Sequence, residues 1–192
     1  MTTNEHVQTN SVNDMISKVA STQIFWVMSF SILTAFSAQV WVPVNPVPFT
    51  LQTVLVLLSG AFLGSKNGFY SQVVYLFAGA IGIPVFAGFF AGAHVLFGPT
   101  GGYLIAFPFA AYLTGAIIEA RRTTFNIILG MVAGTAVILL TGALYLSTFF
   151  NGDIGQALFS GALVFSVWDV IKIAATFSIY KAIAVKFPKL PA

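Results

Sequence analysis

Long charge-free runs alternate with short charged segments along the chain. Asp, Glu, Lys and Arg are absent from residues 19–65, 67–118 and 123–152, and a further apolar run covers 156–183. About 20 apolar residues in a helix cross the hydrocarbon core of a bilayer, which is about 30 Å thick. The first two runs are each long enough for two such helices, and each of the other two holds one. The pattern therefore predicts six helices, at residues 23–41, 50–64, 68–82, 101–119, 124–149 and 156–183.

The composition supports a membrane protein. Of 192 residues, 58% are hydrophobic and 7% are charged, whereas soluble domains carry about 25% charged residues. This excludes a soluble enzyme and a disordered chain, and the lack of cysteine excludes a disulfide scaffold. The strict alternation of a membrane β-barrel is absent. We predict an all-α polytopic membrane protein, with a polar N-terminal arm (1–21), a single six-helix transmembrane domain (22–185) and a short cytoplasmic tail (186–192).

The positions of the basic residues predict the orientation. Cytoplasmic loops of membrane proteins carry an excess of Lys and Arg. With the N-terminus inside, the predicted external loops 42–49, 83–100 and 150–155 hold no Lys or Arg, and seven of the eight basic residues lie at cytoplasmic ends: Lys18, Lys66, Arg121, Arg122, Lys181, Lys186 and Lys189. Both termini are therefore predicted to be cytoplasmic. A net charge of +3 without a dense basic face argues against nucleic-acid binding.

The eighth basic residue, Lys172, lies inside the last predicted helix, three residues after Asp169. Residues three apart share a helix face. Counting from Gln156 places Asp169 about 20 Å along the helix, where a charge is costly and usually functional. Two interpretations stay open, a structural ion pair and a polar anchor for a small ligand.

Two further segments have candidate site residues. The polar side chains of Gln52 and Thr53 interrupt an apolar helix and are expected to point inward, behind a proline-rich loop at 43–48. The glycine-rich stretch 83–100 is either a pocket wall or a plain external re-entrant loop. In the first case its apolar wall comes from Phe86, Phe89, Phe90 and Phe97, and the N–H groups of Gly101 and Gly102 donate to a polar ligand atom at a helix start.

Small residues four apart, such as Ser31 and Ala35, favour close helix packing within the bundle or docking on a partner membrane protein. The two histidines, His6 and His94, are far apart in the sequence, which disfavours a metal site. An intramembrane enzyme acting on a lipid substrate is an alternative function, although Asp169 is the one carboxylate predicted deep in a helix. A stand-alone small-solute channel is another alternative, although polar rings that would line a pore are missing.

Four motifs together resemble the BioY family, the biotin-specific S components of energy-coupling factor (ECF) vitamin transporters. They are PVPFTLQT after the first predicted helix, IGIPVFAGFFAG and GPTGGYL around the start of the fourth, and D-x-x-K on the last. The resemblance implies a six-helix plasma-membrane protein that captures biotin from the outer side. It also implies an occluded pocket near helices 4 and 6 and the 1–2 and 3–4 loops. The chain would not be an enzyme and would need no cofactor or metal.

The resemblance implies partners as well: biotin, membrane lipid, a transmembrane coupling protein and two cytoplasmic ATPases. Contact with the coupling protein is expected at Ser31 and Ala35. The expected ligand-binding residues are Asn45, Gln52, Thr53, Phe86, Gly88, Gly98, Thr100, Gly101, Gly102, Tyr103, Asp169 and Lys172.

Overall fold

The computed structural model describes residues 22–186; the predicted arm and residues 187–192 of the predicted tail lie outside this range. The longer helices are α2 (Gln23–Ala38), α3 (Gln52–Ala80), α4 (Gly101–Ala120), α5 (Thr124–Leu146), α6 (Ile154–Gly161) and α7 (Ser166–Lys186). A two-stranded hairpin, β1 (Trp41–Val42) and β2 (Phe49–Thr50), follows α2. Four 3₁₀ turns complete this part of the chain: η1 (Ala87–Phe89), η2 (Ala93–Phe97), η3 (Ser147–Phe150) and η4 (Leu163–Phe165). The predicted all-α class is confirmed.

Helix α3 folds back on itself at Gly64. This residue lies within Gln52–Ala80 but has non-helical dihedral angles, φ 79° and ψ 179°. Gln52 Nε2 donates to the Tyr75 hydroxyl at 2.6 Å, and Gln72 Nε2 donates to Ser59 Oγ at 3.1 Å. Each bond joins the first half of α3 to the second, so the two halves run antiparallel. They correspond to the two helices predicted at 50–64 and 68–82, with one non-helical residue in place of a loop.

The two halves of α3 and helix α4 cross closely at Gly60. A Cβ on Gly68 would lie 2.8 Å from Gly60 Cα, so the halves touch through backbone. On its other side Gly60 faces the backbone carbonyl of Ala111 in α4, and a Cβ there would overlap that oxygen. Glycine lets helix backbones approach this closely because it lacks a side chain.

The carboxylate of Glu119, near the end of α4, secures the turn of α3. Its Oε1 accepts from the Ser65 backbone N–H and its Oε2 from Ser65 Oγ, both at 2.8 Å. Ser65 begins the second half of α3, where backbone N–H groups have no partner inside the helix. The carboxylate therefore acts as a helix cap supplied by a neighbouring helix.

We expect Glu119→Ala to lower the melting temperature by about 3–6 °C, because loss of a cap costs about 1–2 kcal/mol. Glu119→Gln keeps one acceptor oxygen and is expected to lose less. Thermal unfolding of both purified variants in the same detergent measures the difference. Equal melting temperatures for Glu119→Ala and the unchanged chain would show that the cap contributes nothing.

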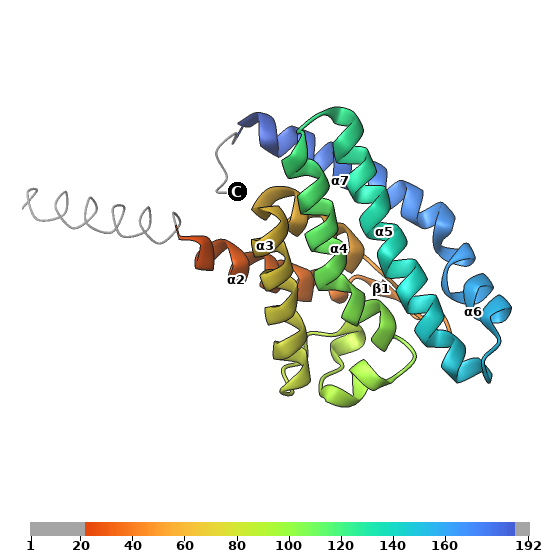
Figure 1. Cartoon of the computed structure of the whole chain (residues 1–192). Helices are drawn as coiled ribbons and strands as arrows, with labels where there is room; N and C mark the ends of the chain where they lie inside the picture. The colour runs from red at the N-terminus through yellow and green to blue at the C-terminus, as the bar shows by residue number, and fades with distance from the viewer. Residues whose placement is uncertain (1–21, 187–192) are drawn as a thin grey trace, which may run out of the picture.

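Helix α4 lies at the centre of the bundle and packs against α3 on one side and α5 on the other (Figure 1). Among the described residues, three segments are long and apolar enough to cross a membrane: Gly101–Ala120, Thr124–Phe150 and Ile154–Ala184. Helix α2 is a shorter apolar helix. The count of six spans and the cytoplasmic termini stay predictions.

The last predicted helix, 156–183, is interrupted between α6 and α7. Ala162 has non-helical dihedral angles, φ −131° and ψ −54°. Immediately before it, the carbonyl of Gly161 accepts a hydrogen bond from the Tyr103 hydroxyl at 2.8 Å. A Cβ on Gly161 would overlap that hydroxyl, so Tyr103 fits against the break because residue 161 is glycine. The prediction of one continuous helix was therefore wrong.

The small residues of α2 pack inside the bundle. Ser31 is 6% exposed, and Ala35 packs partly buried against the core. The outward face of α2 carries large apolar side chains such as Ile24, Ile32 and Phe36. Of the two interpretations of this spacing, the structure favours packing within the bundle. The expected contact with a partner protein at Ser31 and Ala35 stays a prediction, because both side chains face the interior of this chain.

Candidate functional site: a cavity between the loops and helices

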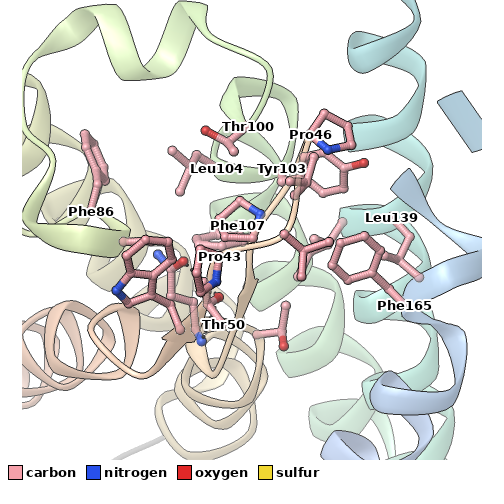
Figure 2. Close-up of a pocket in the computed structure, with 18 of the residues that line it drawn as sticks. Pro43, Pro46, Thr50, Phe86, Thr100, Tyr103, Leu104, Phe107, Leu139 and Phe165 are labelled. Carbon is pink, nitrogen blue, oxygen red and sulfur yellow. Dashed lines mark hydrogen bonds between the residues drawn. The ribbon is translucent and has the colours of Figure 1, made fainter. Parts of the chain in front are cut away.

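A cavity of about 400 Å³ lies under the loop that joins β1 and β2. Small-molecule pockets usually occupy about 300–1,000 Å³. Its walls are mostly apolar: Figure 2 shows Phe86 on one side and Leu139 with Phe165 on the other, with Phe107 between them. Residues from the 43–48 loop, α3, the 85–95 stretch, α4, α5 and the start of α7 all contribute. The cavity is therefore built from segments distant in the sequence.

The β-hairpin positions the proline-rich loop over the cavity. Trp41 pairs with Thr50 and Val42 with Phe49 in an antiparallel register, which closes the intervening loop. The Phe49 ring packs on Phe165, with centroids 4.3 Å apart, and so attaches the hairpin to the segment leading into α7. All six residues from Pro43 to Pro48 line the cavity.

Asp169 and Lys172 form the charged part of the cavity wall. Lys172 Nζ lies 3.2 Å from Asp169 Oδ1, and the side chains are 11% and 6% exposed. The second carboxylate oxygen, Oδ2, is buried and has no hydrogen-bond partner among residues 22–186. Asp169 lies in the first turn of α7, not midway along a continuous helix as counting from Gln156 indicated. The positive end of the α7 dipole favours the carboxylate there.

Gln52 and Thr53 both line the cavity, as predicted from their polarity. Thr53 Oγ1 is buried without a hydrogen-bond partner in the part of the chain that the structure describes. Gln52 differs, because both ends of its amide are engaged: Oε1 accepts from Thr50 Oγ1 at 3.0 Å and Nε2 donates to Tyr75. Thr53 and Asp169 thus each have a polar atom available to a ligand, and Gln52 stabilises the wall.

Four other predicted residues also line the cavity: Asn45, Phe86, Thr100 and Tyr103. The Phe86 ring is 1% exposed and lies over Gly79, where a side chain would overlap it. Asn45 is on the exposed rim. The Tyr103 hydroxyl donates a hydrogen bond to the Gly161 carbonyl, so Tyr103 contributes its aromatic ring to the cavity wall.

The four glycines predicted as ligand contacts lie outside the cavity lining. Gly101 donates its N–H to the Gly98 carbonyl at 2.9 Å, so this N–H group is not free, contrary to the sequence prediction. A Cβ on Gly101 or Gly102 would overlap neighbouring backbone or the Tyr145 side chain, which indicates a packing role. Gly88 packs beside Trp41, where a Cβ would lie 3.0 Å from the indole. A glycine that allows close helix packing and a glycine that lies against a ligand look the same in a sequence.

Two of the four predicted wall phenylalanines also lie outside the lining. Phe89 and Phe97 are 67% and 74% exposed, whereas Phe86 and Phe90 line the cavity. Leu104 and Phe107 also line the cavity and were not predicted, although their helical spacing from Thr100 and Tyr103 places them on the same face. Several apolar lining residues carry no such signal in the sequence: Trp41, Ile138, Leu139 and Phe165.

The arrangement suits binding of a small, largely apolar molecule. An acceptor on Asp169 and donor hydrogens on Lys172 lie together in a wall that is mostly apolar. Such pockets use a few placed polar groups to orient a ligand. Within residues 22–186 no group of three or more His, Asp or Glu side chains is placed to hold a metal ion.

Comparison with known proteins agrees with this description. A curated relative from Pyrococcus horikoshii, "Probable biotin transporter BioY", is 42% identical over 153 residues, which cover 79% of this chain and 90% of the relative. The "Biotin transporter BioY" of Thermotoga maritima is 40% identical over 144 residues, covering 75% and 85%.

A solved structure gives the same fold. The crystal structure of the S-component for biotin from an ECF-type ABC transporter superposes with a TM-score of 0.78 at 26% identity, covering 95% of this chain and 94% of that one. The model of the BioY family matches residues 8–189, nearly the whole sequence. This chain therefore belongs to the BioY family.

Proposed function

We propose that the chain is the biotin-binding S component of an ECF-type uptake transporter. The observation that carries this proposal is the cavity, in which the unpartnered Asp169 Oδ2 lies beside the Lys172 ammonium group within apolar walls. The curated relatives and the similar solved structure, all described as biotin proteins, name the ligand that these groups suit.

The chemistry of biotin matches the groups in the cavity. Its ureido ring has two N–H donors and one carbonyl acceptor, and its thiophane ring is apolar. We assign one ureido N–H to Asp169 Oδ2 and the ureido oxygen to Lys172, with Thr53 Oγ1 as a further polar contact. The valerate carboxylate then extends toward Asn45 at the exposed rim. The reverse orientation would bring two carboxylates together at low dielectric, where like charges repel strongly.

The same proposal includes the transport partners and the membrane orientation. A transmembrane coupling protein and two ATPases would supply the energy, and this chain would capture the ligand from outside the plasma membrane. Six spans with both termini inside place Lys66, Arg121 and Arg122 on the cytoplasmic side. The bond between Glu119 and Ser65 supports this orientation, because it brings the α3 turn beside the end of α4 and so places these basic residues at one end of the bundle.

Purified full-length chain in detergent is expected to bind biotin saturably at one site, without ATP or other proteins. Isothermal titration calorimetry gives the stoichiometry and affinity. Bound ligand should also raise the melting temperature, because it stabilises the folded state alone. Thiamine and riboflavin serve as controls and are not expected to bind. A chain that unfolds cooperatively but does not bind biotin would refute the proposal and direct the search to other ligands.

A further inference from the structure

The irregular segment 85–90 forms one wall of the cavity through Phe86, Ala87 and Phe90. Its backbone is strained, because Phe89 has φ 60°, which residues other than glycine rarely adopt. Gly88 beside it has φ 70°. Such conformations persist where surrounding contacts fix them, often next to ligands. The contacts that hold this segment therefore affect the cavity wall.

Gln39, the C-cap residue that follows α2, holds segment 85–90 through three hydrogen bonds from its side-chain amide. Its Nε2 donates to the carbonyls of Val85 at 3.4 Å and Phe86 at 3.1 Å. Its Oε1 accepts from the Phe89 N–H at 3.0 Å. One amide thus contacts, through both its nitrogen and its oxygen, a segment 46 to 50 residues further along the chain, while Nε2 also donates to the Ala35 carbonyl of α2 at 3.3 Å. A bond to Phe89 N–H helps to fix its left-handed conformation.

Hydrogen bonds connect the same segment to the cavity floor. The Tyr75 hydroxyl donates to the Val85 carbonyl at 3.2 Å, so Val85 is held from two sides. Tyr75 in turn accepts from Gln52, which lines the cavity. The segment is thus attached to α3 through Tyr75 and to α2 through Gln39. Removing Gln39 would leave the α3 side attached and release the α2 side.

We propose that Gln39 is a positioning residue that fastens segment 85–90 over the cavity and so sets how slowly the ligand leaves. This inference rests on the proposed function for its ligand, biotin. Gln39 is absent from the cavity lining, so it acts through Phe86, Ala87 and Phe90. Loss of its bonds should speed dissociation about 10-fold, as expected for losing one to two net hydrogen bonds. Association should change less than about 2-fold, because the charged anchors stay in place.

The experiment uses full-length chain in detergent with the variants Gln39→Met and Gln39→Glu. Methionine keeps the length of the side chain and removes both polar groups. Glutamate keeps an acceptor for Phe89 N–H, but its second oxygen would face the carbonyls of Val85 and Phe86 and repel them, so its dissociation rate should be at least as fast as that of Gln39→Met. Gln23→Leu is the matched control, because Gln23 is an exposed glutamine at the opposite end of α2.

Two measurements decide the outcome: the dissociation rate of labelled biotin chased with unlabelled biotin, and hydrogen exchange in peptides that contain Phe89. Faster dissociation together with faster Phe89 exchange in Gln39→Met supports the proposal. Unchanged exchange refutes the fastening role, and faster exchange with unchanged dissociation refutes the effect on retention. If the unaltered chain binds no biotin, the proposed function and the retention role both fail, while the exchange data still decide the fastening role.

Discussion

Replacing Asp169 by Asn is expected to weaken biotin binding about 100-fold, equivalent to about 2.8 kcal/mol, within the range for a hydrogen bond to a charged group plus a mismatch. Asparagine has nearly the same shape and can keep an oxygen toward Lys172. Its NH₂ group then replaces Oδ2, the oxygen to which no described residue hydrogen-bonds. A donor would face a ureido donor, so binding is lost more than folding. Calorimetry and thermal unfolding of the same sample separate the two effects.

Lys172→Met tests the other half of the pair and should also weaken biotin far more than it lowers the melting temperature. Asp153→Asn is the matched control. Asp153 caps α6 by accepting from the Gln156 N–H at 2.9 Å, and asparagine caps helices equally well. Normal binding by both Asp169→Asn and Lys172→Met would show that the ligand is held elsewhere.

Gly60→Ala is expected to destabilise the fold by about 3 kcal/mol, the upper end for overpacking in a core. The new methyl group would meet the Ala111 backbone carbonyl, which cannot move without shifting α4. The second half of α3 lies against the other side of Gly60, so the first half cannot retreat. In thermal unfolding this corresponds to a melting temperature lower by about 6–12 °C.

Gly155→Ala provides the comparison for Gly60→Ala. Gly155 lies in α6, and an added Cβ would meet Asp153 Oδ1 alone, at 3.3 Å. Alanine has the higher helix propensity, so this variant should be as stable as the parent or more so. Equal melting temperatures for Gly60→Ala and Gly155→Ala would mean that the close crossing of α3 and α4 is not required.

The sequence was most informative where polarity opposed the surroundings. Four polar residues interrupt apolar helices: Asp169, Lys172, Gln52 and Thr53. Exposing such side chains to lipid is costly, so they face the interior of the bundle or a cavity. All four line it. Apolar residues carry no comparable signal, because Ile138 could equally face lipid or a pocket. The α5 wall was therefore missed.

The helices were predicted better than their interruptions. The bounds of α4 and α5 agree to within a few residues with the helices predicted at 101–119 and 124–149. The break after Gly161 depends on the Tyr103 hydroxyl, which comes from a helix 58 residues earlier. A local pattern cannot contain such a partner. The same limit applies to Gln39, whose role depends on a loop that only tertiary structure brings near.

The folding back of α3 makes the two faces of the molecule unequal in height. At about 1.5 Å per residue, the 20 residues of α4 rise about 30 Å, which matches the hydrocarbon core. Each half of α3 and the 16 residues of α2 rise less than about 25 Å. If α2 and the halves of α3 cross the bilayer, as the six-span prediction requires, the lipid beside them would thin to cover their apolar surface, at a cost of fractions of a kcal/mol per ångström. Such hydrophobic mismatch would favour shorter-chain lipids as neighbours on that face.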